Sequence, residues 1–108
     1  MDIAKVRVSA GILHRALLAG GFQHTRVLYE MKRLVDRVDC IDRIFYADVQ
    51  PLEEALKEYI ATEAYTVTPE IFQRCQQFSN ELQGRRLRNL NLLIIRFSKN
   101  RKSEDAKE

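Results

Sequence analysis

Residues 24–49 of this 108-residue chain read HTRVLYEMKRLVDRVDCIDRIFYADV, the longest uninterrupted run of helical periodicity in the sequence. The apolar residues of this stretch recur at alternating intervals of four and three: Val27, Met31, Leu34, Val38, Ile41 and Phe45. This spacing places them on one side of an α-helix. We therefore predict a single long central helix over residues 24–49, about 40 Å in length, along which the rest of the chain packs.

The composition is that of a folded helical domain. Hydrophobic residues make up 45% of the chain and charged residues 31%, and only two Pro and four Gly interrupt the apolar-periodic segments. A chain of this length forms one domain. We predict an all-α fold, an antiparallel helical bundle of four to five helices, that spans residues 1–99 and is followed by a flexible charged tail at residues 100–108.

The first segment, residues 3–19, carries two apolar rows on different sides of the predicted helix. The first row is Ile3, Val6, Ala10, Leu13 and Leu17, and the second is Val8, Ile12, Ala16 and Ala19. A helix that is apolar on two sides is covered on both, either by other helices of its own bundle or by a second copy of the chain. A strand over residues 3–8 is the competing interpretation.

Glycine and proline mark the first predicted helix boundaries. Gly20 and Gly21 end the first helix, and Thr25 or Gln23 opens the next one, so that the two helices form an antiparallel hairpin. Pro51 ends the central helix and serves as the first residue of a third helix.

Two further helices are predicted in the C-terminal half. Thr68 has the position of an N-cap, with Pro69 as the first residue of the fourth helix. The phase of the apolar positions changes at Gly84, so we expect the fourth helix to end or kink there and a fifth segment to run from residue 85 to about residue 98. A strand over residues 92–98 is the alternative to this fifth helix.

The two cysteines, Cys40 and Cys75, occur singly inside helical patterns. They form neither a disulfide framework nor a CxxC pair, so we expect free thiols and a reducing compartment. The sequence contains no apolar run of about 20 residues and no apolar segment of signal-peptide type near its start. We therefore expect a cytoplasmic, intracellular location and no membrane partner.

No residue pattern in the sequence indicates catalysis. His14 and His24 lack carboxylate or thiol companions at metal-ligand spacing, and the chain has no HExxH motif, no glycine-rich phosphate loop and no nucleophile elbow. We expect surface or helix-end roles for both histidines. The chain is predicted not to be an enzyme, with no catalytic residue, no metal site and no cofactor.

Asp42 is the one polar residue that the predicted central helix places within its apolar stripe. A buried, unpaired carboxylate is costly, so Asp42 lies either at the edge of the stripe, in water or paired with a neighbouring helix, or in a helix–helix interface whose register it fixes.

A candidate partner surface combines two apolar regions outside the main stripes. One is the second row of the first helix, and the other is the side of the central helix that carries Tyr29 and Ile44. The candidate contacts are Val8, Ile12, Ala16, Tyr29 and Ile44. Burial of these residues inside the same bundle is the alternative.

Positive charge is concentrated at the C-terminal end. Residues 1–83 contain ten Lys or Arg and twelve Asp or Glu, a net charge of −2, whereas residues 84–108 contain eight and three, a net charge of +5. Candidate contacts to an anion or a nucleic acid are Arg85, Arg86, Arg88, Arg96, Lys99, Arg101 and Lys102. Such a segment faces phosphates, an acidic protein or an anionic membrane, or it is a solvated face that balances the acidic remainder.

These patterns favour binding over catalysis. We predict a non-enzymatic protein–protein interaction module, such as an adaptor, assembly subunit, inhibitor or chaperone-like factor, whose partner is a protein and which forms a homodimer. The alternative is a nucleic-acid-binding protein that uses the basic segment 85–102.

Overall fold

The described residues form five α-helices. The structure, a computed structural model, describes residues 2–62, 68–82 and 87–106, and within α5 it describes side chains as far as residue 98. The helices are α1 (Ile3–Ala19), α2 (Thr25–Val38), α3 (Tyr46–Ala61), α4 (Pro69–Glu81) and α5 (Arg88–Ala106). The described residues contain no strand, so the all-α prediction is confirmed and the strand alternatives at residues 3–8 and 92–98 are wrong.

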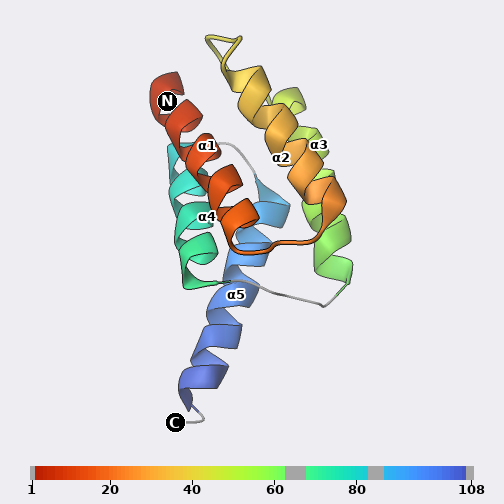
Figure 1. Cartoon of the computed structure of the whole chain (residues 1–108), viewed down its shortest axis with the longest axis vertical. Helices are drawn as coiled ribbons and strands as arrows, with labels where there is room; N and C mark the ends of the chain where they lie inside the picture. The colour runs from red at the N-terminus through yellow and green to blue at the C-terminus, as the bar shows by residue number, and fades with distance from the viewer. Residues whose placement is uncertain (1, 63–67, 83–86, 107–108) are drawn as a thin grey trace.

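Successive helices run in alternating directions and close into a ring (Figure 1). Going round it, α1 packs against α2, α2 against α3, α3 against α5, α5 against α4, and α4 against α1. The helices α3 and α5 are neighbours in this ring. They run in the same direction, because the chain reverses twice between them, once before and once after α4. The C-terminal half of α5 extends beyond the other helices (Figure 1), which contributes to the long dimension of 47 Å against 25 and 24 Å for the others.

The core contains an apolar stripe from every helix. Its members include Val6, Ala10, Leu13 and Leu17 of α1, Val27, Met31, Leu34 and Val38 of α2, Leu52, Leu56 and Tyr59 of α3, Ile71, Cys75 and Phe78 of α4, and Leu90, Leu93 and Phe97 of α5. The apolar cavity left among these side chains has a volume of about 20 Å³. Ligand pockets are typically roughly 300–1,000 Å³, so this cavity is far smaller than a small-molecule site.

The predicted single helix over residues 24–49 is wrong, because α2 ends at Val38 and α3 begins at Tyr46. Arg7 of α1 holds the turn between them. Its guanidinium donates to the backbone carbonyls of Val38 and Ile41, each over 2.7 Å. The last carbonyls of a helix have no partner within the helix, so a cation placed there stabilises the helix end.

The start of α3 is fixed on the other side of the same turn. The Asp48 carboxylate accepts the backbone N–H of Phe45 over 2.8 Å and pairs with Arg37 of α2 over 3.1 Å. Pro51 is therefore not the first residue of a helix, as predicted, but lies inside α3. Because Pro51 has no N–H, it cannot donate to the carbonyl of Ala47, and α3 lacks one backbone hydrogen bond at that position.

The connection between α1 and α2 turns on Gly21, which has a positive φ of 71°. Such a conformation strains any residue with a side chain. Thr25 is the first residue of α2, as predicted, and the N-cap before it is His24, whose Nδ1 accepts the backbone N–H of Val27 over 3.3 Å.

The predicted start of the fourth helix is confirmed, since Thr68 accepts the backbone N–H of Ile71 over 3.2 Å. The predicted break at Gly84 lies outside the described residues. The backbone of α5 is helical as far as Ala106. The flexible charged tail at residues 100–108 stays a prediction.

Candidate partner-binding face

The structure does not bring the five residues of the predicted partner surface together on one exposed face. Ile44 is only 1% exposed and Ala16 is also buried, so neither can contact a partner. Because the chain turns after Val38, Ile44 faces the core instead of continuing the outer side of a helix. Val8 of α1 and Tyr29 of α2 are exposed.

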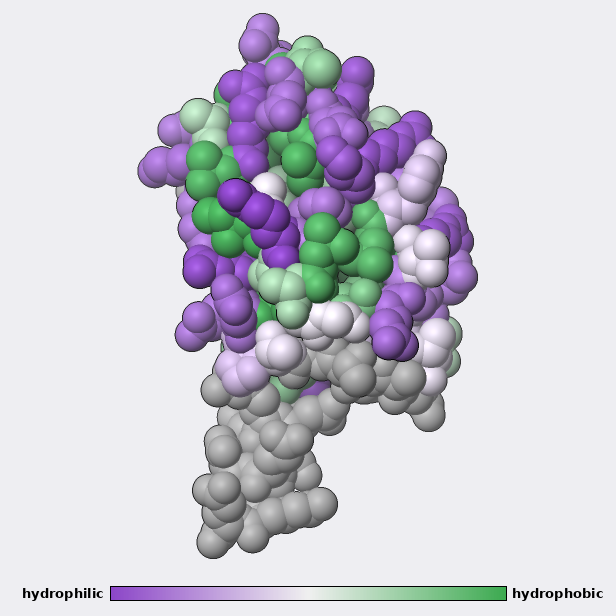
Figure 2. Space-filling view, in the orientation of Figure 1, coloured by the Kyte–Doolittle hydropathy of each residue, from purple (hydrophilic) through white to green (hydrophobic). Residues whose placement is uncertain are grey.

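The second apolar row of α1 is partly covered within the chain. The helices α2 and α4 flank α1, and a Cβ added at Gly20 would lie 2.7 Å from Cδ1 of Ile71, which shows how closely α1 and α4 approach. Figure 2 looks onto α1 and shows several apolar areas separated by hydrophilic side chains rather than one continuous patch. Of the row, Ile12 is half-buried, and Val8 and Ala19 are exposed.

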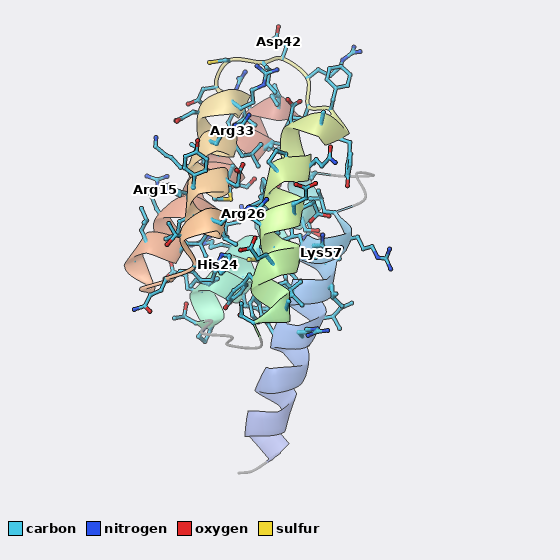
Figure 3. All side chains as sticks on the ribbon, turned by 90° about the vertical axis from the view of Figure 1, so that its right-hand side faces the viewer. Arg15, His24, Arg26, Arg33, Asp42 and Lys57 are labelled. Carbon is cyan, nitrogen blue, oxygen red and sulfur yellow. The ribbon has the colours of Figure 1, made fainter. Side chains whose placement is uncertain are left out.

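Asp42 lies exposed in the turn between α2 and α3, at one end of the molecule (Figure 3). The interpretation that places it in water is therefore confirmed. Its predicted alternative role in fixing the register of a helix–helix interface is wrong, because the residue is not in a helix.

The histidines occupy different surroundings. His24 caps α2, and its ring lies 5.3 Å from that of Tyr59. His14 is half-buried in α1, where burial and the nearby Lys32 lower its pKa. Within the described residues, no three or more His, Cys, Asp or Glu side chains gather in a way that could hold a metal ion.

A buried carboxylate joins α3 to α5. Glu53 is 3% exposed, and its two oxygens accept the backbone N–H groups of Asn89 over 3.1 Å and Leu90 over 3.0 Å. In return, the Asn89 side-chain amide donates to the Glu53 carbonyl over 2.8 Å. Burial raises the pKa of Glu53, and the N–H groups at the start of α5 oppose that rise. Glu53 thus caps α5 from a neighbouring helix.

Next to this contact, a groove of about 370 Å³ opens between α3 and α5. Its lining is partly apolar and partly cationic: Lys57 and Ile60 from α3, and Arg88, Asn89 and Leu92 from α5. Leu92 is 37% exposed, and Ile95, one turn further along α5, is 51% exposed. We call these six residues, the groove lining and Ile95, the α3/α5 face.

The α3/α5 face is positively charged. Among the described residues, neither Lys57 nor Arg88 has an ion-pair partner. The exposed acids of α3 lie elsewhere on the helix, since Glu54 and Glu58 both pair with Arg26 of α2. Figure 3 shows the two sides, with Arg26 between α2 and α3 and Lys57 on the side of α3 that faces α5.

The structure places the basic candidates of the C-terminal segment unevenly. Arg88 lies on the α3/α5 face, and Arg96 is half-buried. Arg85 and Arg86 lie outside the described residues. Lys99, Arg101 and Lys102 belong to the part of α5 for which only the backbone is described. Sequence reasoning missed Lys57, because no local pattern connects residue 57 with residue 88.

Comparisons with protein families, with curated proteins and with solved structures find no match to this chain. No helix in the described parts of the chain is both long enough and apolar enough to cross a membrane. What bears on function is the chemistry of the α3/α5 face.

Proposed function

We propose that this chain is a non-enzymatic protein–protein interaction module, an adaptor, assembly subunit, inhibitor or chaperone-like factor, that receives its partner on the α3/α5 face. The observation that carries the proposal is the exposure of Leu92 and Ile95 beside Lys57 and Arg88, two cations that have no ion-pair partner among the described residues. Exposed aliphatic side chains gain roughly 25 cal/mol for each Å² that a partner covers. Cations around such a centre favour one partner over others by charge.

The same observation separates a protein partner from a nucleic acid. Phosphates are bound by cations and N–H donors, and they leave an exposed aliphatic side chain in water. Leu92 and Ile95 lie on the outer side of α5, where a phosphate backbone would not bury them. A protein segment with apolar side chains would bury both residues.

Nucleic-acid binding is the second candidate function. It is supported by the acid-free stretch from Gly84 to Lys102 and by the way α5 extends past the bundle (Figure 1). Under this alternative, affinity for duplex DNA falls with salt with a log–log slope of about −0.9 for each phosphate contacted. Changing Arg85 and Arg86 to Glu and Arg88 to Ala would then abolish binding while leaving the helical spectrum intact.

A second copy of the chain remains a candidate partner, through Val8 and the half-buried Ile12 of α1. Sedimentation at micromolar concentration tests this part of the proposal. A particle of twice the chain mass of 12.6 kDa is expected, and a particle of 12.6 kDa would overturn it.

Photo-cross-linking tests the proposed function directly. A photoreactive amino acid replaces Ile95 in one variant and Leu18 of α1 in a control, because the two side chains are similarly exposed, at 51% and 55%. Each variant is irradiated in a nuclease-treated extract of the cells that produce the protein. We expect a discrete protein adduct at position 95 and none at position 18. Adducts at both positions, at neither, or only to nucleic acid in untreated extract would refute the proposal.

A further inference from the structure

We propose that the α3/α5 face binds an acidic amphipathic helix of the partner protein. This inference rests on the proposed function and names the partner's chemistry at the same face.

The charge of the groove selects an acidic occupant. Lys57 and Arg88 line it from opposite helices, and no acid lies among its lining residues. The buried carboxylate beneath, Glu53, already accepts two backbone N–H groups of α5. The acids on the exposed side of α3 pair with Arg26, away from the groove. A carboxylate on the occupant would therefore supply the partner that both cations lack.

The shape of the groove suits a helix rather than an extended strand. Backbone N–H and C=O groups within α3 and α5 are bonded inside those helices, so no sheet edge is available for strand addition. Two neighbouring helices instead form a channel into which the side chains of a third helix fit, at positions i, i+3, i+4 and i+7. Leu92 provides an exposed apolar contact along this channel, and Ile95 extends it by one turn, whereas Ile60 lines the channel but is buried.

The groove is also held rigid before any partner arrives. Glu53 accepts three hydrogen bonds from α5, two from Asn89 at 2.8 and 3.1 Å and one from the backbone N–H of Leu90 at 3.0 Å. Asn89 itself lines the groove. A site that is ordered in advance loses less entropy on binding, so a moderate number of contacts gives measurable affinity.

The experiment measures the binding of labelled peptides to the full chain by fluorescence anisotropy. The probe is a peptide of about 16 residues with Leu at i, i+3, i+4 and i+7 and Glu on both flanks, about 24 Å long as a helix. One matched peptide carries Lys in place of every Glu. A second has the composition of the probe but disperses its Leu residues around the helix. We expect the probe to bind, with affinity that falls as salt is raised, and both matched peptides to bind at least tenfold more weakly.

Two double variants locate the binding site. Lys57→Ala with Arg88→Ala removes both groove cations and avoids placing a new acid beside Glu53. Lys5→Ala with Arg15→Ala makes the same change in net charge on the exposed side of α1. We expect the groove variant to bind the probe about fivefold to thirtyfold more weakly and the α1 variant to bind it like the wild type. Circular dichroism checks that both double variants are folded. If the groove variant is unfolded, the single variant Lys57→Ala takes its place.

The outcomes separate the inference from the proposed function. Equal loss of affinity in the two double variants would mean attraction by net charge alone and would overturn the inference. The inference would also be overturned if an oligonucleotide or an anionic phosphatidylserine vesicle bound through Lys57 and Arg88 while the acidic peptide did not bind. If the probe fails to bind while Ile95 still cross-links to a protein, the proposed function stands and only the acidic-helix inference is lost.

Discussion

Glu53 of α3 accepts the backbone N–H of Leu90 in α5 over 3.0 Å, across 37 positions of sequence. The first turn of any helix leaves N–H groups without partners inside the helix. Here a carboxylate from another helix takes up two of them, so one contact both caps α5 and fixes it against α3. The groove beside this contact depends on the same geometry.

Replacing Glu53 should therefore destabilise the protein. In Glu53→Gln, an amide NH2 group replaces one carboxylate oxygen and cannot accept a hydrogen bond. One backbone N–H at the start of α5 is then left buried without a partner. We expect the free energy of unfolding to fall by about 1–3 kcal/mol in a denaturant titration. The matched control is Glu54→Gln, because Glu54 is exposed and its nearest cation, on Arg26, is 3.8 Å away. Equal effects at the two positions would contradict the capping role.

The stability of the wild type should depend on pH through Glu53. Burial raises the pKa of this carboxyl above its ordinary value of 4.5, so the folded state holds the proton more tightly than the unfolded state. The stability contributed by this proton is present below the unfolded pKa and is lost as pH rises through the folded pKa. We therefore expect the wild type to exceed Glu53→Gln in stability by more at about pH 4 than at about pH 7. A difference that grows with pH instead would show that the pKa of Glu53 is lowered on folding.

The apolar stripe of α2 should be essential for folding. Leu34→Asp places an unpaired charge in the core, where Leu34 is 2% exposed. We expect a loss of several kcal/mol, enough to unfold a domain of ordinary stability. The same change at Leu18, which is exposed, serves as the control and should leave the thermal melt nearly unchanged. If Leu34→Asp melts like the parent protein, the stripe is not the core.

The two thiols should differ sharply in reactivity. Both cysteines are free, as predicted, but Cys40 is exposed and Cys75 is buried. Burial raises the pKa of Cys75 to about 12, so its reactive thiolate form is scarce near neutral pH. We expect Ellman's reagent to titrate one thiol in the native protein and both after denaturation. Rapid reaction of both thiols in the native protein would show that the packing of α4 against α1 and α5 does not bury Cys75.

The fold could largely be predicted from the sequence because most of its signals are local. The apolar rows of α1 and α4 follow helical spacing, and the N-cap at Thr68 precedes its helix directly. The turn after Val38 was missed for a physical reason. The apolar spacing continues through it to Phe45, and the contacts that hold the turn come from Arg7, which is distant in sequence.

The candidate face could be predicted only in part. Arg88 was identified from the run of basic residues, since charge is visible in a sequence. Lys57 and Ile60 were not assigned to the face, because only the packing of α3 against α5 brings them beside Leu92. The role of Glu53 also depends on this packing, because its carboxylate accepts N–H groups at the start of a different helix, α5.

The position at which an acidic amphipathic helix binds is the most direct test of the central claim. Backbone amide chemical shifts of the isotope-labelled full chain are recorded while the Leu- and Glu-containing peptide is added. We predict saturable shift changes centred on Lys57, Ile60, Asn89 and Leu92, with the amides around Arg15 of α1 unaffected. Shift changes centred on α1 and α2, or none at a concentration of peptide that saturates anisotropy, would contradict the assignment of the α3/α5 face as the binding site.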